Sequence, residues 1–289
     1  MTTKVIKFET PSSRKIHWDT IVFVAIFHLL AGYAIYLINW PSVAAFMLTW
    51  WISGSLGIGL GYHRLLTHKG FKTPRWLMRT LATFGALALQ SGPIAWVTTH
   101  RLHHAFTDTD RDPHSPRNGV FWSHIGWIFK GTAQIQPQAV VEKYSPDLLK
   151  DRYLVALEKY YYVPTVIVGL AAFLIGGLPM LLGAVFLRTV VLWHFTWLVN
   201  SATHLWGSRR FDVRDDSRNN ALVAAVTFGE GWHNNHHAIP RSARHGLTWR
   251  EFDINWIQIK TLEKLGLATD IYAYDLNDES NTEAIKMAA

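Results

Sequence analysis

The sequence predicts an all-α integral membrane protein, with four transmembrane helices and a helical cytoplasmic cap that carries a histidine-rich site. Three observations lead to this fold class. Long apolar runs with at most one charged residue each occur in two pairs, the lysines and arginines avoid the turns within these pairs, and two histidine triplets with the same spacing lie outside the runs. A hydrocarbon core requires about 20 apolar residues per helix, and each of the runs is close to that length.

The first pair of runs predicts a transmembrane hairpin over residues 18–61. We expect its spans at roughly 19–39 and 41–61, joined by the turn Asn39-Trp40-Pro41-Ser42. A polar N-terminal arm, residues 1–17, precedes the hairpin on the cytoplasmic side. This arm has no apolar core and no cleavage signature, so we do not expect it to be a signal peptide.

The second pair of runs predicts another transmembrane hairpin over residues 161–204. Its spans are expected at roughly 161–178 and 181–203, because Gly176-Gly177-Leu178-Pro179 contains residues that interrupt helices. Arg188 lies near the external end of the last span. We expect its long side chain to extend outward to water.

The distribution of positive charge predicts which segments face the cytoplasm. Of the 28 lysines and arginines, four lie in the N-terminal arm, thirteen in residues 61–159 and ten in residues 205–289. Cytoplasmic segments of membrane proteins are enriched in these residues, so we expect segments 62–160 and 205–289 to be cytoplasmic. The first would carry two histidine motifs, and the second would be a cap with a third motif and a flexible tail. The net charge of +7 is then a sign of membrane orientation, and we expect no nucleic-acid partner.

The segment from Leu81 to Thr99 is also apolar, but Gln90-Ser91-Gly92-Pro93 interrupts it. A membrane crossing here would put the two histidine triplets on opposite sides of the bilayer. Broken helices are tolerated where they are buried in protein. We therefore expect a buried or in-plane helical segment on the cytoplasmic side.

Two histidine triplets have the spacing i, i+3, i+4, which places three imidazoles on one face of a helix. Their members are His100, His103 and His104 in one, and His233, His236 and His237 in the other. Brought together, the two faces would offer six imidazoles to one small volume.

Two further pairs lie at the cytoplasmic ends of the predicted spans. Asn200 and His204 have the spacing i, i+4 and share a helix face. His63 and His68 are five residues apart, so an ideal α-helix would direct them about 140° from each other. They could reach two different ions, or converge on one if the helix ends near Gly70.

The absence of cysteine restricts any transition-metal site to imidazole, carboxylate or amide ligands. Imidazole suits iron, copper and zinc, and a four-coordinate zinc site uses at most four ligands. Nine histidines exceed one such site and fit two metal ions of higher coordination number better. Nearby carboxylates commonly accept a hydrogen bond from the outward ring nitrogen of a ligand histidine. The candidates are Asp108, Asp110, Asp112 and Glu230.

The other histidines have a different interpretation, because a single histidine is usually a surface residue or a satisfied core residue. This interpretation applies to His17, His28, His124, His194 and His245. For His114, within the acidic motif, a structural role and a supporting role at the metal site both stay open. Glu230 and His233 form one Glu-x-x-His element, but a soluble carboxylate di-iron bundle needs two copies and two further glutamates.

Four stretches together resemble the histidine motifs of membrane fatty acid desaturases. They read GYHRLLTHKGF from Gly61, HRLHHAFTDTDRDPHSP from His100, NSATHLWGSRRFD from Asn200 and GEGWHNNHH from Gly229. They are most similar to the delta-9 branch, which includes stearoyl-CoA enzymes and bacterial and cyanobacterial acyl-lipid enzymes. The resemblance covers about residues 18 to 267, and the form HNNHH differs from the delta-12 and omega-3 branch.

The resemblance implies a non-haem di-iron oxidoreductase that uses dioxygen and two electrons to introduce a cis double bond, at the delta-9 position, into a saturated acyl chain. Two Fe²⁺ ions would be bound by nine histidines, and Asn200 would contact one ion through water. The matching histidines are His63, His68, His100, His103, His104, His204, His233, His236 and His237. The substrate would be an acyl-lipid or an acyl-CoA in contact with membrane lipid, and the acyl carrier stays open.

Electrons would come from a separate carrier such as ferredoxin or cytochrome b5, because the sequence contains no dinucleotide- or flavin-binding motif, no cysteine cluster and no fused haem domain. Two alternatives stay open. A related di-iron hydroxylase or ketolase would insert oxygen instead of a double bond, and a metal transporter would carry polar residues within its spans. Such residues are few here, chiefly His28, Arg188, His194 and Asn200, which favours the desaturase.

Overall fold

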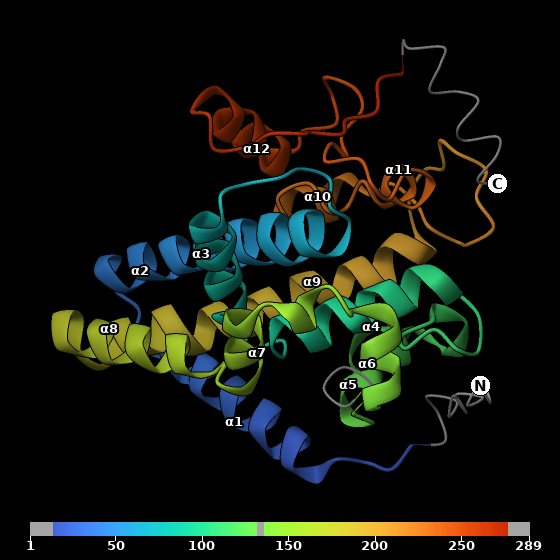
Figure 1. Ribbon diagram of the computed structural model, residues 1–289. Coiled ribbons are helices and arrows are strands. Elements are labelled where there is room, and N and C mark those ends of the chain that lie inside the picture. The colour runs from blue at the N-terminus through green and yellow to red at the C-terminus, as the bar shows by residue number, and fades with distance from the viewer. Residues whose placement is uncertain (1–13, 132–135, 277–289) are drawn as a thin grey trace.

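The computed structural model describes residues 14–131 and 136–276, and within these ranges the chain is helical, with isolated bridges but no β-sheet (Figure 1). Most of the expected N-terminal arm, and the last part of the expected flexible tail, lie outside the described residues. Within the described residues, three helices are long and apolar enough to cross a membrane: Trp18–Tyr36, Trp40–Thr67 and Val163–Leu205.

The first two of these helices form a hairpin. Helix α1 (Trp18–Tyr36) is followed by α2 (Trp40–Trp50), which continues without interruption as the wider helix η2 (Trp51–Thr67). At the turn, Ser42 donates its backbone N–H to Asn39 Oδ1 at 2.9 Å, and the Asn39 N–H donates to Ser42 Oγ at 3.0 Å. This reciprocal cap satisfies two N–H groups that have no partner within the helix.

The second helix is longer than expected. It was expected to end near residue 61, but it continues to Thr67, for 28 residues in total. This is longer than the about 20 residues that suffice to cross a hydrocarbon core. The extension contains His63, which therefore lies in the last part of this helix.

The third apolar helix contains a break where the sequence predicts one. It comprises α8 (Val163–Leu181), η6 (Leu182–Leu187) and α9 (Arg188–Leu205). Gly176 and Gly177 leave the helical conformation, and Gly177 has a φ of 64°, which favours glycine. Gly169 lies directly against the side chains of Leu181 and Val185, so the segments before and after the break pack against each other.

The expectation for Arg188 was wrong. Its side chain is fully buried instead of extending outward. It donates from Nε to the carbonyl oxygen of Ala184 at 3.1 Å and from Nη1 to that of Leu87. Leu87 ends helix α3 (Arg75–Ala86), where carbonyl groups lack partners within the helix and carry partial negative charge, so a buried cation is stabilised there.

The interrupted segment forms α3 and α4 (Pro93–Phe106), with the break at 87–92. Trp193 Nε1 donates to the carbonyl oxygen of Ala88 at 2.9 Å, next to the contact of Arg188 with Leu87. The irregular backbone is therefore satisfied by α9, as a break buried in protein requires.

The remaining helices are short and surround the ends of the long ones. Between α4 and α8 lie η3 (Pro116–Asn118), η4 (Trp122–Gly126), α5 (Trp127–Phe129), α6 (Gln138–Tyr144), η5 (Leu148–Lys150) and α7 (Arg152–Lys159). After α9 follow α10 (Ala221–Val226), α11 (His233–Ala238) and α12 (Ile254–Lys264). Figure 1 shows these last three at the top of the view, along the α2–η2 helix. Ser55 Oγ donates to Asn255 Oδ1 at 2.6 Å and so connects η2 to α12.

Candidate metal centre

The width of helix η2 decides how His63 and His68 are arranged. The N–H of His68 donates to the carbonyl oxygen of His63 at 3.1 Å, which is the i→i+5 bond of a π-helix. Five residues therefore make about one turn, and the two rings lie 4.8 Å apart. Of the two arrangements that the sequence left open, the rings converge. The helix ends at Thr67, near Gly70 as that arrangement requires, and its last turn is a wide one.

The first group of converging histidines comes from three elements. The nitrogen atoms that its members offer all lie within 4.8 Å of one another. His236 Nε2 is 3.1 Å from His63 Nε2 and 3.0 Å from His104 Nε2, which in turn is 3.1 Å from His100 Nε2. The members are His63 and His68 at the end of η2, His100 and His104 on α4, and His236 on α11.

The second group contains the other four predicted ligands, again with nitrogen atoms within 4.8 Å of one another. His103 Nε2 lies 3.3 Å from His237 Nε2, and His204 Nε2 lies 3.0 Å from His233 Nε2. His204 comes from the last turn of α9, one turn after Asn200. Each triplet is thus divided between the two groups, a division that the sequence did not provide.

Carboxylates contact the outward Nδ1 atoms of these histidines. Glu230 lies 2.6 Å from His63 Nδ1, Asp112 3.0 Å from His103 Nδ1, and Asp108 3.1 Å from His204 Nδ1. The fourth candidate, Asp110, is exposed, and the structure does not bring it to either group.

These contacts define which ring nitrogen carries the proton. A carboxylate accepts a hydrogen bond, so we infer that the proton is on Nδ1 and that Nε2 has a free lone pair. In the facing pair His103 and His237 both rings have a carboxylate on Nδ1, so their Nε2 atoms face each other at 3.3 Å as acceptors, an arrangement that repels unless a cation is bound. Each group also brings at least four histidine nitrogen atoms within 4.8 Å of one another, so the residues present fit metal ions in both groups.

Burial keeps most of these imidazoles in the neutral form that binds metals. It lowers the pKa below 6.5 for six of the nine, and neighbouring histidines lower it further. The six are His68, His100, His104, His233, His236 and His237. Although burial alone would raise the pKa of Asp112, the adjacent His103 and His114 hold it below its usual range.

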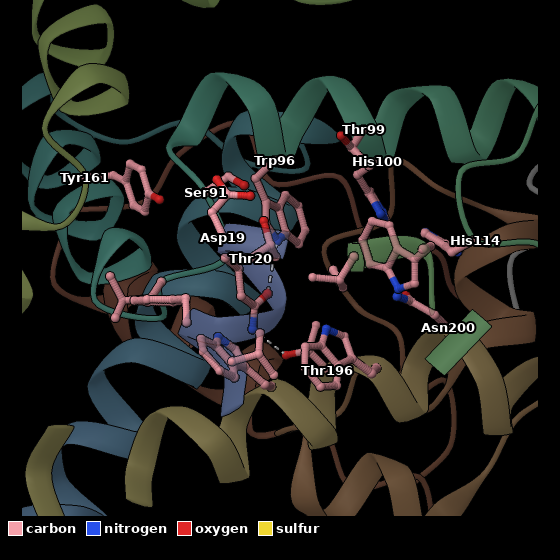
Figure 2. A pocket seen from close by; sticks show the side chains of 18 residues that line it. Asp19, Thr20, Ser91, Trp96, Thr99, His100, His114, Tyr161, Thr196 and Asn200 are labelled. Atoms are coloured by element: carbon pink, nitrogen blue, oxygen red, sulfur yellow. Dashed lines mark hydrogen bonds between the residues drawn. The ribbon is translucent and has the colours of Figure 1, made fainter. Parts of the chain in front are cut away.

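An apolar cavity of about 400 Å³ opens beside the first group (Figure 2). This volume lies within the usual range for small-molecule sites. Figure 2 shows His100, His114 and Asn200 at one side of the cavity and Tyr161 at the other. Four tryptophans line it: Trp96, Trp127, Trp193 and Trp197.

A smaller cavity of about 60 Å³ lies on the other side of Trp96 and Thr196, which line both cavities together with His100 and Asn200. Gln90 links two of these shared residues by hydrogen bonds. Its Nε2 donates to Thr196 Oγ1 at 2.9 Å, and its Oε1 accepts from Trp96 Nε1 at 3.2 Å. The two cavities therefore share a wall next to the histidine groups.

Comparison with known proteins identifies this combination of histidine groups and apolar cavities. A profile described as fatty acid desaturase matches residues 10–253. The chain belongs to the fatty acid desaturase family. It is accordingly a fatty acyl desaturase, an oxidoreductase of lipid metabolism, and the hydroxylase and transporter alternatives are not favoured.

Curated relatives of the desaturase cover nearly its whole length. It is 46% identical over 264 residues to an sn-2 palmitoyl-lipid 9-desaturase of Nostoc sp. (strain 36), covering 91% of this chain and 93% of that protein. It is 44% identical over 268 residues to an sn-1 stearoyl-lipid 9-desaturase of Anabaena variabilis, covering 92% and 97%. An acyl-CoA C20 Delta5-desaturase of Anemone leveillei is 42% identical over 251 residues, covering 87% and 80%.

The structure of the desaturase adds one carboxylate that the sequence analysis missed. Asp215 lies 2.9 Å from His237 Nδ1. It corresponds to Asp112, which contacts His103, so both rings of the facing pair have a carboxylate partner. Nothing in the sequence around Asp215 marks it, because it lies in an irregular segment between the motifs.

Glu230 forms the centre of a buried network in the desaturase. Arg64 is buried and donates to Glu230 Oε1 from both Nε and Nη2, at 3.1 and 3.0 Å, while Asn255 Nδ2 donates to the same oxygen at 2.7 Å. His245, interpreted as structural, is a core residue, but its Nδ1 lies 3.2 Å from Glu230 Oε2 and its ring lies 4.5 Å from that of His236. It therefore contacts the site more closely than expected.

His114, whose role was left open, lies beside the second group. Its ring is 4.4 Å from that of His103, and its Nδ1 is 3.7 Å from Asp112 Oδ1. Burial lowers the pKa of His114 to about 3, so it is neutral at physiological pH. It also lines the large cavity and forms part of the wall between the cavity and the second group.

Proposed function

We propose that this desaturase introduces a cis double bond at the delta-9 position of a saturated acyl chain carried by a membrane glycerolipid. The observation that carries the proposal is the position of the two histidine groups next to the wall that two apolar cavities share. Two relatives that match over more than nine tenths of this chain are named lipid 9-desaturases, which favours a glycerolipid over a CoA ester.

We assign two Fe²⁺ ions to the site, one for each histidine group. Zinc has no redox chemistry, whereas the family activity oxidises an acyl chain, so among the metals suited to imidazole a redox-active one is needed. The first ion would be held by the five histidines of the first group and the second by the four of the second group. Asn200, which lines both cavities, would contact one ion through water.

The reaction removes two neighbouring hydrogens from the chain, and dioxygen, two electrons and two protons complete its balance with two molecules of water. When bound, the irons supply the dioxygen activation that an unactivated C–H bond requires. The protein positions the substrate and excludes water from it. The cavities hold the acyl chain, which has no polar groups along its length, near the histidine groups, and the tryptophan walls keep water out. Asp108, Asp112, Asp215 and Glu230 hold the Nδ1 protons and so aim the Nε2 lone pairs.

We further propose four membrane spans with the histidine groups on the cytoplasmic face. The break at Gly176 and Gly177 divides the third apolar helix into two segments that pack against each other, which supports a second hairpin. Nearly all lysines and arginines lie in the arm, the middle segment and the cap, as the positive-inside rule requires.

The electron donor is assigned as a separate acidic carrier, such as ferredoxin or cytochrome b5. The chain itself has no cysteine to hold an iron–sulfur cluster, and the net charge of +7 would attract an acidic partner.

Expression in a host that lacks its own desaturase tests the proposed function. We expect monounsaturated acyl chains on glycerolipids, with the double bond located at position 9 by mass spectrometry. Hydroxylated chains, or unsaturation confined to acyl-CoA, would contradict the reaction or the carrier, respectively.

A further inference from the structure

A second set of histidines lies apart from the two metal groups. His28 of α1, His194 of α9 and His124 of η4 form a continuous chain. His28 Nε2 lies 3.0 Å from His194 Nε2, and His194 Nδ1 lies 3.0 Å from His124 Nε2. These residues are 166 and 70 positions apart along the sequence, so only the fold brings them together.

Every ring nitrogen of this histidine chain lies beside another polar atom. At one end His28 Nδ1 lies 2.7 Å from the carbonyl oxygen of Val24, and at the other His124 Nδ1 lies 3.1 Å from Ser201 Oγ. The Val24 carbonyl can only accept, so His28 donates to it from Nδ1. His194 then donates to His28, and His124 donates to His194. Ser201 donates its single hydroxyl proton to the carbonyl oxygen of Trp197 at 2.8 Å, so its Oγ lies beside His124 Nδ1 without donating to it. Three neutral imidazoles therefore satisfy the three contacts that run from Val24 to His124.

The three elements joined by the histidine chain also form walls of the large cavity. Helix α1 contributes Phe23 and Val24, and α9 contributes Trp193 and Trp197. Trp127, immediately after η4, contributes a third side. The histidine chain contacts this wall directly, because the His194 and His124 rings lie 5.2 and 5.8 Å from that of Trp197.

Hydrogen bonds are needed here because apolar contacts alone have little directionality. The wall packs through side chains such as Phe27, Trp193 and Trp197, whose burial is non-directional. A chain of hydrogen bonds across α1, α9 and η4 fixes the distance and rotation of these elements. The width of the cavity between them is fixed with it.

We propose that His28, His194 and His124 are positioning residues that hold the tryptophan wall and thereby set where the acyl chain lies relative to the metal centre. The inference rests on the proposed function, because it takes the cavity to be the acyl site. An acyl chain offers no polar group along its length, so its register depends on the shape of the cavity. A looser wall lets the chain slide, and the double bond then forms at more than one position.

The test is the distribution of double-bond positions made by His194→Phe and His28→Phe. Phenylalanine keeps an aromatic ring for the tryptophan contacts but removes the nitrogens. We expect both variants to accumulate as the wild type does and to give a several-fold larger share of products with the double bond displaced. The double variant should displace the double bond little more than either single variant does, since each change breaks the same series of hydrogen bonds. Leu29→Ala, at an exposed position on α1, is the matched control and should leave the distribution unchanged.

A merely structural role gives a different result. If the variants lose total product and thermal stability but keep one double-bond position, the positioning role is wrong, as it is if nothing changes. Failure of the proposed function is recognised separately, because the wild-type chain would then make no delta-9 product. If His194→Phe does not accumulate, His28→Phe and His124→Phe alter the two ends of the histidine chain and test the same proposal.

Discussion

His103 and His237 face each other with their Nε2 atoms 3.3 Å apart, and each has a carboxylate on its Nδ1 atom: Asp112 for His103 and Asp215 for His237. Both facing nitrogens are therefore acceptors. The pair is stable in this arrangement only with a cation at the site, so the two carboxylates and the metal depend on each other.

Asp215→Ala is predicted to weaken metal binding at the second group. Without the carboxylate, His237 loses the contact that fixes its proton on Nδ1 and its ring orientation. Loss of such a partner typically costs about 10–100-fold in metal affinity or activity. Elemental analysis after dialysis against a weak chelator measures the effect. Asp110→Ala removes an exposed carboxylate from the same kind of irregular segment and should leave the metal content unchanged.

Arg64→Met is predicted to destabilise the protein strongly. The guanidinium is buried and pairs with Glu230 at 3.0 Å and Asp253 at 2.9 Å, so its removal leaves two buried carboxylates without their cation. Breaking a buried pair in this way costs about 3–5 kcal/mol. Thermal unfolding in detergent is the measurement, and an unchanged midpoint would show that the network carries little stability.

A matched control for Arg64 exists on the surface. Lys72 pairs with Asp270 at 2.7 Å, but both side chains are largely exposed. Exposed pairs contribute little to stability, so Lys72→Met should leave the unfolding midpoint nearly unchanged.

The metal-free protein is predicted to lose stability as the pH falls below 6.5. Burial lowers the pKa of His100, His104 and His236 in the folded state, so between that lowered pKa and 6.5 the unfolded chain binds more protons. Stability from these groups is therefore present above pH 6.5 and decreases below it. Unfolding midpoints of the chelator-treated protein across pH 5 to 8 measure this slope, and a flat or inverted profile is inconsistent with neutral buried imidazoles.

The topology is predicted to protect a cysteine at position 118 from external reagents. The chain has no native cysteine, and Asn118 is exposed in the middle segment that we assign to the cytoplasm. An Asn118→Cys variant in sealed cells should react with a membrane-permeant thiol reagent only. Labelling by an impermeant reagent would place the segment outside and overturn the orientation.

The parts of the site that follow a helical period could be predicted from the sequence. The spacing in His100–His104 and His233–His237 predicts one face of a helix, and both triplets do lie in the centre. The convergence of His63 and His68 could not be predicted, because no pattern in the sequence indicates that η2 forms i→i+5 hydrogen bonds. Asp215 was missed for another reason: it lies in an irregular segment, 22 residues before His237, where no helical period applies.

In the fold, too, features with a local sequence pattern could be predicted, and features that depend on tertiary contacts could not. The break at Gly176 and Gly177 was predictable because glycine and proline interrupt helices locally. The burial of Arg188 was not, because its partner is a carbonyl group 101 residues away at the end of α3. Tertiary contacts of this kind leave no local pattern, and they also account for the unforeseen histidine chain.

Metal stoichiometry tests the central claim most directly, that two histidine groups hold two metal ions. We predict about two irons per chain in protein purified under iron-replete conditions, and about one in His204→Ala, which removes a member of the second group only. His17→Ala is the histidine control, since His245 contacts Glu230 and is unsuitable. A His204→Ala variant that retains both irons, or an active wild-type protein that contains zinc alone, would contradict the account.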